Sequence, residues 1–152
     1  MSNNLWDTIN RVATEDDLDQ IAELEALGYE ECLPRSTLLH VMGFQTYIVN
    51  TLNDDVLGYV AFDRHRDHND EEAITIHRIA VHPSSRRRGI GWRLMTFCVD
   101  VARGLDCNLQ LITIPEREQL GSEFFLAAMS FKEINAAGCI SLYLYQETSN
   151  EI

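Results

Sequence analysis

The stretch from residue 73 to residue 103 restricts the fold more than any other part of this chain. Residues 73–81, AITIHRIAV, are mostly apolar and rich in β-branched side chains, which is typical of a buried central strand. From about residue 89 to residue 103, apolar side chains recur at the spacing of one helix face. A buried strand that leads through a short loop into an amphipathic helix predicts an α/β domain.

The other segments complete a fold in which strands and helices interleave. Strands are predicted over residues 9–14, 45–51, 56–65, 108–114, 131–136 and 140–147, and further helices over residues 14–28, 35–42 and from residue 117 onward. Thr14 precedes the first of these helices as its N-cap, and Gly28 ends it. Because several strands follow one another directly, we expect a single mixed, mostly antiparallel sheet flanked by helices. The length of 152 residues suits a single domain over residues 1–152.

The charge balance restricts the partners. Asp and Glu number 24, Lys and Arg number 12, and the formal net charge is −12. This excess argues against nucleic acid or an anionic membrane as a partner. It suits a cationic substrate such as an amine, although carboxylates that only keep the surface solvated explain it equally well. No apolar run reaches the ~20 residues of a membrane-spanning helix, and the first residues lack the layout of a secretory signal, so we expect a cytoplasmic protein.

The cysteines show no metal-binding or disulfide pattern. Cys32, Cys98, Cys107 and Cys139 are scattered, without the CxxC or Cys/His spacing of a zinc site. Reduced, mostly buried thiols are the expected state, and we expect no bound metal. None of the four stands where a catalytic nucleophile is expected.

The loop before the long helix has the features of an anion site. Its sequence, SSRRRGIGWR, places four arginines within eight residues, at positions 86, 87, 88 and 93. Glycines at the start of a helix let backbone N–H groups approach phosphate oxygens, and the helix dipole favours negative charge there. We therefore expect a ligand that carries a diphosphate, although arginines that only form surface salt bridges remain the alternative. Neither GxxxxGK[ST] nor GxGxxG is present, so the P-loop and the dinucleotide-binding motif are not expected.

The stretch VHPSSRRRGIGWRLM resembles the acetyl-CoA signature of the GCN5-related N-acetyltransferase (GNAT) superfamily. The core pattern of that signature is [R/Q]-x-x-G-x-[G/A], which stands here as residues 86–91. RVATEDDLDQIAELEALG resembles the opening strand and helix of the family, and EFFLAAMSFKEI resembles its late helix. The resemblance implies an acyl-CoA-binding fold in which two central strands splay apart.

The resemblance also implies where acetyl-CoA binds. The pyrophosphate would lie on backbone amides of the loop, with the arginines as additional charge, and the pantetheine arm would pair with the end of the central strand. The residues implied to bind the cofactor are Ile79, Ala80, Val81, Arg86, Arg87, Arg88, Gly89, Ile90, Gly91, Trp92 and Gln119. Gln119 stands where many relatives have an asparagine.

The acid and base of such a reaction are less clearly marked. Many relatives have a tyrosine in the late helix that protonates the leaving thiolate, and this chain has Leu126 there. At the position where some relatives have a glutamate or tyrosine that acts as the general base, this chain has Thr75. His77, Tyr143 and Glu72 remain as candidates for catalytic residues. Strand alternation predicts that Thr75, His77 and Ile79 share one face, and an imidazole there could deprotonate an amine. A hydrogen-bonded structural histidine is the alternative.

Two functions follow from this resemblance. The first is an N-acetyltransferase that moves an acetyl group from acetyl-CoA to a primary amine by direct transfer in a ternary complex. The acceptor would be a protein N-terminus or a small cationic amine. The second is a non-catalytic acyl-CoA-binding regulatory module of the same fold, which the missing tyrosine and Thr75 favour. Since domains of the family often pair through their terminal strands, a homodimer could form.

Overall fold

The protein, seen in a computed structural model, is built on one twisted sheet. The structure describes residues 7–29, 32–66, 69–85, 89–113, 131–137 and 140–145. The strands are β1 (Ile9–Val12), β2 (Thr46–Leu52), β3 (Asp55–Arg66), β4 (Glu72–Val81), β5 (Asn108–Thr113), β6 (Phe131–Ala137) and β7 (Ile140–Tyr145). They form a seven-stranded sheet in the order β1-β2-β3-β4-β5-β7-β6. Only β4 and β5 are parallel, so the predicted mixed, mostly antiparallel sheet is confirmed.

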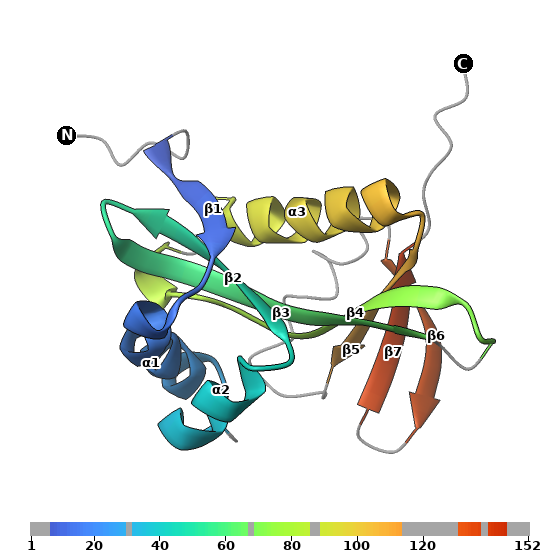
Figure 1. Cartoon of the computed structure of the whole chain (residues 1–152), viewed down its shortest axis with the longest axis horizontal. Helices are drawn as coiled ribbons and strands as arrows, with labels where there is room; N and C mark the ends of the chain where they lie inside the picture. The colour runs from blue at the N-terminus through green and yellow to red at the C-terminus, as the bar shows by residue number, and fades with distance from the viewer. Residues whose placement is uncertain are drawn as a thin grey trace.

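Helices cover both faces of the sheet (Figure 1). The helices α1 (Leu18–Gly28) and α2 (Arg35–Val41) lie on one face, and α3 (Ile90–Leu105) lies on the other. Each face has its own hydrophobic core. Ile74 and Ile76 face α3, whereas Tyr59 and Ala61 face α1 and α2. The predicted late helix, from residue 117 onward, lies outside the described residues.

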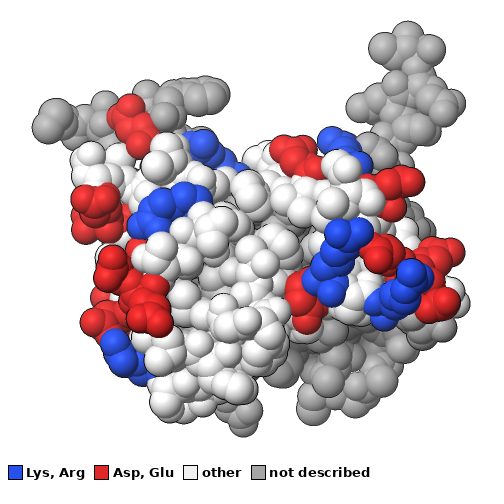
Figure 2. Space-filling view, in the orientation of Figure 1, with Lys and Arg blue, Asp and Glu red and all other residues white. Residues whose placement is uncertain are grey.

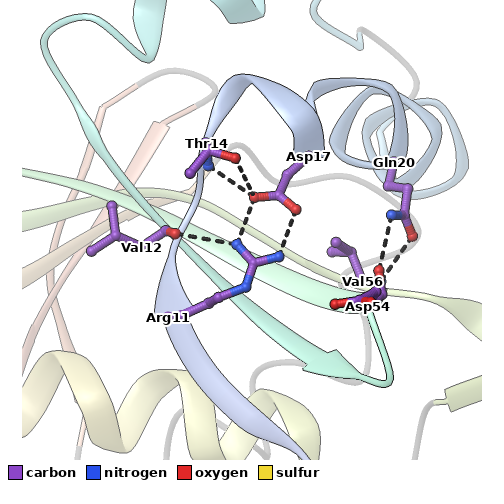
Figure 3. Close-up of polar contacts among 7 residues, drawn as sticks. All are labelled: Arg11, Val12, Thr14, Asp17, Gln20, Asp54 and Val56. Atoms are coloured by element: carbon purple, nitrogen blue, oxygen red, sulfur yellow. Dashed lines mark hydrogen bonds and ion pairs between the residues drawn. The ribbon is translucent and has the colours of Figure 1, made fainter.

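The turn from β1 into α1 is held by a buried carboxylate (Figure 3). Asp17 accepts two hydrogen bonds from the Arg11 guanidinium, at 2.7 and 2.8 Å, and one from the Thr14 backbone N–H at 2.8 Å. The hydrogen bond from Arg11 is the main reason that the pKa of Asp17 lies below its ordinary value. Thr14 is the N-cap of a short 3-10 turn over Glu15–Asp17, and Asp17 rather than the predicted Thr14 is the N-cap of α1. Gln20 of α1 accepts a hydrogen bond from the Val56 N–H of β3 at 2.8 Å and donates to the Asp54 carbonyl, in the turn between β2 and β3, at 3.2 Å.

The two parallel strands separate along their length. Residues 73–76 of β4 pair with residues 108–111 of β5, and no pairing between these strands is described beyond Ile76 and Leu111. The rest of β4 stays paired with β3 up to Val81. In the described part of the chain, β5 does not continue its pairing along β4 beyond Ile76, and we call residues 77–81 of the edge that faces β5 the open edge of β4. The splayed pair of central strands is confirmed.

A β-bulge lies where the strands begin to separate. Ala61 pairs with Arg78 and Phe62 pairs with Ile76, so β4 has one extra residue, His77. Ile76 and Ile79 both pack toward α3, and between them Arg78 reaches Glu25 on the α1 side. The prediction that His77 and Ile79 share one face is therefore wrong, because the bulge interrupts the two-residue alternation that it assumed.

Gly58 of β3 allows the start of α3 to approach the sheet. A Cβ atom on Gly58 would lie 3.0 Å from the Ala80 carbonyl oxygen and 3.2 Å from side-chain atoms of Ile90 and Leu94. Gly58 also pairs with Val81, the last residue of the open edge. The start of α3 and the open edge of β4 are thus held side by side by one close contact.

We predict that Gly58→Ala lowers the free energy of unfolding by about 1–3 kcal/mol, because the added methyl group overpacks a contact that includes backbone. Urea denaturation would measure this loss. Gly104→Ala is the matched control, since a Cβ atom there meets nothing within 4 Å. Alanine at that helical position should stabilise by up to about 1 kcal/mol. Equal stability of the Gly58→Ala variant and the wild type would contradict the prediction.

Candidate functional site

The amino end of α3 begins with a glycine in a left-handed conformation. Gly89 is its N-cap, with φ of 81°, a backbone conformation that other residues adopt at a cost. Its carbonyl accepts the first bond within the helix, from the Arg93 N–H at 3.0 Å. The backbone N–H groups of Ile90, Gly91 and Trp92 precede that bond, so they have no acceptor within the helix. Together with the helix dipole they can hold an anion.

The described side chains at the start of α3 anchor the helix to the rest of the domain. Ile90 is buried in the core on the α3 side, and Trp92 is exposed. Arg93 turns away toward β1, where its guanidinium donates to the Thr8 carbonyl at 3.0 Å and to the Thr8 hydroxyl at 2.7 Å. Its expected contribution to the anion site is therefore not supported. Residues 86–88 lie outside the described residues, so the roles predicted for the other three arginines stay predictions.

The open edge of β4 presents backbone groups beside that helix end. The His82 N–H donates to the Leu57 carbonyl at 2.8 Å, and bonded and non-bonded pairs alternate in an antiparallel ladder. This alternation turns the N–H and C=O of Ala80 toward β3. It turns those of Ile79 and Val81 toward the open edge. An extended ligand could therefore pair with Ile79 and Val81 as an additional strand would.

A tyrosine from the end of α1 already lies on this edge. The Tyr29 hydroxyl donates to the Ile79 carbonyl at 2.9 Å and accepts from the Ile79 N–H at 3.0 Å. Its ring lies under the Arg78 guanidinium, 4.0 Å from the ring centroid. The open edge is thus an effective binding surface for polar groups, and in this structure a residue of the chain itself binds there.

A buried ion pair positions that tyrosine. Glu25 of α1 is fully buried, and its carboxylate oxygens lie 2.8 and 3.0 Å from Nε of Arg78. The Tyr59 hydroxyl donates to the same carboxylate at 2.5 Å. Burial is the main reason that the pKa of Tyr59 lies well above its ordinary value, so this hydroxyl stays a donor. Arg78 therefore has little freedom to move away from the Tyr29 ring.

A second cluster of polar side chains lies on the α1 side of the sheet, across β3, β4 and β5. Its members are Asp63, His65, Thr75, His77 and Gln110, which we call the polar row. His65 makes a short hydrogen bond with the Thr75 hydroxyl, and that hydroxyl lies 3.4 Å from the Gln110 side-chain oxygen. The row thus brings three neighbouring strands together where β4 and β5 begin to separate.

His77 lies at the bulge within this row. Its Nε2 atom is 3.1 Å from Oδ1 of Asp63, although the geometry does not make a hydrogen bond and both atoms are buried without one. About 29% of the His77 side chain is exposed, so the imidazole reaches solvent by another edge. His77 therefore combines a carboxylate neighbour with access to solvent, as a residue that exchanges a proton with a ligand requires.

The structure argues against Glu72 as a base. Glu72 begins β4, five residues before the bulge, and accepts a hydrogen bond from Nε of Arg64 at 2.6 Å. That bond is the main reason that the pKa of Glu72 is lowered, and a lowered pKa makes a carboxylate a weaker proton acceptor. Tyr143 belongs to β7, which pairs with β5, but its side chain and Gln119 lie outside what the structure describes. Their roles stay predictions.

Two of the described cysteines are poorly suited to act as nucleophiles. Burial raises the pKa of the Cys98 thiol to about 12, so it stays protonated at neutral pH. Burial is also the main reason that the pKa of Cys107 is raised. Within the described ranges, His, Cys, Asp and Glu side chains form no group of three or more that could hold a metal ion.

Charged side chains of both signs lie next to one another on the visible surface (Figure 2). They gather toward the two sides of this face, and uncharged surface lies between them. Arg35 with Asp19 and Arg64 with Glu72 are examples of such exposed pairs. Much of the visible charge is therefore locally compensated.

Sequence reasoning missed several residues of this site. Tyr29, Glu25 and Arg78 meet across a separation of about fifty residues, which no periodic pattern reveals. Asp63 had a weak signal, because it is the first charged residue after the apolar run of β3 and lies two positions after Ala61, on the same face of the strand.

Comparison with known proteins gives one clear family. The model of the acetyltransferase (GNAT) family matches residues 16–131. Comparison with curated proteins gives no match. Among the helices that the structure describes, none has the length and apolar composition needed to cross a lipid bilayer.

Solved structures share the fold at low sequence identity. A transcriptional regulator from Bacillus halodurans is 22% identical, with a TM-score of 0.72 over 86% of this chain and 97% of that one. The ribosomal-protein-S18-alanine N-acetyltransferase of Escherichia coli is 14% identical, with a TM-score of 0.73 over 95% and 98%. Arabidopsis thaliana Naa50, solved with the bisubstrate analogue CoA-Ac-MVNAL, is 14% identical, with a TM-score of 0.71 over 93% and 99%.

We predict that Glu25→Ala lowers the free energy of unfolding by about 3–5 kcal/mol, because it leaves the Arg78 guanidinium buried without its carboxylate. Chemical denaturation at neutral pH would measure the loss. Asp19→Ala is the matched control on the same helix, since it breaks a pair with Arg35 whose side chains are 60% and 81% exposed. That variant should lose less than about 1 kcal/mol. Similar losses in the two variants would contradict the prediction.

Proposed function

Because the chain belongs to the acetyltransferase (GNAT) family, we propose that it transfers an acetyl group from acetyl-CoA to a primary amine. One observation carries this proposal furthest. A glycine-initiated helix end, suited to phosphate, lies beside the open edge of β4, where the described pairing with β5 has ended and which is suited to an extended arm. Coenzyme A has a pyrophosphate, which the helix end could bind, and an amide-containing arm, which could pair with the strand edge. A single domain over residues 1–152 is part of the proposal.

The described residues fit this cofactor. Backbone N–H groups of Ile90, Gly91 and Trp92, with Gly89 in its left-handed conformation, would hold the pyrophosphate. Ile79 and Val81 would pair with the pantetheine arm, since their N–H and C=O groups face the open edge. Ala80, which faces β3, would contribute only through its position between them. Arg86, Arg87, Arg88 and Gln119 remain part of the proposal by resemblance.

Acetyl-CoA, when bound, supplies an activated acetyl group. The chain's own contribution is to place a donor where charge develops and an acceptor for the proton of the amine. The Ile79 N–H faces the open edge, so it can donate to a carbonyl oxygen that gains negative charge. We propose that His77 takes the proton from the ammonium group of the acceptor, with Asp63 stabilising the imidazolium. The raised pKa of Cys98 supports direct transfer without a covalent acetyl-enzyme.

Two acceptor classes are supported by different observations. Escherichia coli and Arabidopsis thaliana proteins of the same fold act on, or were solved with, protein or peptide amino ends, and this supports a protein N-terminus. The formal net charge of −12 supports a small cationic amine. The alternative function, a non-catalytic acyl-CoA-binding regulatory module, is supported by the fold shared with a transcriptional regulator and by Thr75 at the usual base position.

We predict that Gly89→Glu abolishes acetyl-CoA binding, because it places a carboxylate against the phosphates. Isothermal titration calorimetry would measure the affinity. Gly89→Ala is the matched control, since it has the same backbone strain at φ of 81°, about 1–2 kcal/mol, without the charge. It should weaken binding far less than the glutamate. Unchanged affinity of the Gly89→Glu variant would remove the start of α3 from the site.

Release of free thiol from acetyl-CoA, measured with a panel of peptide and small-molecule amines, tests whether the protein is an acetyltransferase. We predict turnover with at least one amine, and we expect His77→Gln to lower kcat about 100-fold while the Kd for acetyl-CoA stays the same. Clear binding without turnover on any amine would favour the regulatory module. Equal turnover in the variant and the wild type would exclude His77 as the base.

A further inference from the structure

Tyr29 is the residue of the site that the proposed function leaves unexplained. It follows the last residue of α1, and its own N–H donates to the Glu25 carbonyl at 3.0 Å. Its hydroxyl contacts both backbone groups of Ile79, at 2.9 and 3.0 Å. A tyrosine hydroxyl that serves one residue's N–H and C=O at the same time is not needed for the packing of its ring.

The geometry of this contact imitates a neighbouring strand. In an antiparallel ladder, a bonded partner residue accepts from the N–H and donates to the C=O of the residue opposite. The Tyr29 hydroxyl performs both roles at Ile79, because one oxygen accepts a hydrogen bond while its own proton is donated. It does so at the first residue of β4 beyond Arg78 and the bulge, where pairing with β5 has already ended.

The surrounding residues hold the hydroxyl in this place. Arg78 lies over the Tyr29 ring, and Glu25 holds Arg78 by an ion pair at 2.8 Å. The Arg78 side chain is only 15% exposed, and that of Glu25 is fully buried. The ion pair of Arg78 with Glu25 cannot be separated cheaply, so Arg78 and the ring against it are held in place. Displacement of the hydroxyl requires that its two hydrogen bonds to Ile79 be exchanged for others.

We propose that the Tyr29 hydroxyl occupies the binding position of the pantetheine arm when acetyl-CoA is absent. When acetyl-CoA binds, its arm displaces the hydroxyl from the N–H and C=O of Ile79. This inference rests on the proposed function, because it assumes that the arm pairs with the open edge of β4. Without cofactor, Tyr29 satisfies the two polar groups that a bare strand edge would leave exposed. With cofactor, the same two groups pair with the arm, and the hydroxyl moves aside while its ring stays against Arg78.

The test compares the affinity of two ligands for the wild type and for Tyr29→Phe. The variant keeps the ring but loses the hydroxyl that competes for Ile79. Its Kd for acetyl-CoA should be about threefold to tenfold lower than that of the wild type, the range expected when the two competing hydrogen bonds, each of small net strength, are removed. The Kd for 3′-phospho-ADP, which has the phosphates but no acyl arm, should be unchanged.

Tyr47→Phe is the matched control variant. It removes a buried tyrosine hydroxyl that makes no hydrogen bond within the described part of the chain, so neither Kd should change. An unchanged or raised Kd of Tyr29→Phe for acetyl-CoA would overturn the proposal, and so would an equal change for both ligands. Failure of the wild type to bind acetyl-CoA at all would instead overturn the proposed function.

A second measurement keeps the hydroxyl and does not depend on the stability of the phenylalanine variant. Fluorotyrosine incorporated at position 29 alone would report the surroundings of the ring by fluorine NMR. Its resonance should shift when acetyl-CoA is added and stay in place when 3′-phospho-ADP is added. A resonance that does not respond to saturating acetyl-CoA would show that the hydroxyl is not displaced, and this would also overturn the proposal.

Discussion

The separation of β4 from β5 is the constraint on which the rest of the site depends. Two parallel strands that are hydrogen-bonded over residues 73–76 would normally continue as neighbours, and here they do not. The extra residue at His77 supplies the local reason, since a bulge bends and twists the strand that contains it. The consequence is a strand edge in the middle of a sheet, which is the costly feature that the surrounding residues compensate.

Residues on both faces of the sheet surround the open edge of β4 and offset its cost. On the α3 side, Gly58 lets the helix approach closely, so the amino end of α3 lies beside the edge. On the α1 side, Glu25 and Arg78 support Tyr29, whose hydroxyl bonds the exposed backbone. The polar row lies where the separation begins, and it places His77 near Asp63. One departure from regular pairing thus organises an anion site, a strand-like binding edge and a histidine with a carboxylate neighbour.

Features that depend on residues close together in the sequence could be predicted, and features that depend on residues far apart in the sequence could not. Residues 73–81 and 90–105 carry periodic apolar patterns that are local, so the central strand and the long helix were predicted within a few residues. The face of Ile79 was predicted wrongly, because strict alternation has no means of placing a bulge, which depends on how β4 pairs with β3. The turn of Arg93 toward Thr8 depends on a contact across 85 residues and left no local trace.

The sequence by itself determined the order of the described strands and helices, the mixed sheet and the start of α3, because each rests on spacing within one segment or on the glycines at positions 89 and 91. It also determined the resemblance to the GNAT family, which the family match over residues 16–131 confirms. Only the tertiary structure decided which groups surround the open edge. Tyr29 and Ile79 lie fifty residues apart in the chain, and their contact exists because Glu25, buried at zero exposure, must pair with Arg78. A buried charge requires its partner, and that requirement acts through space rather than along the chain.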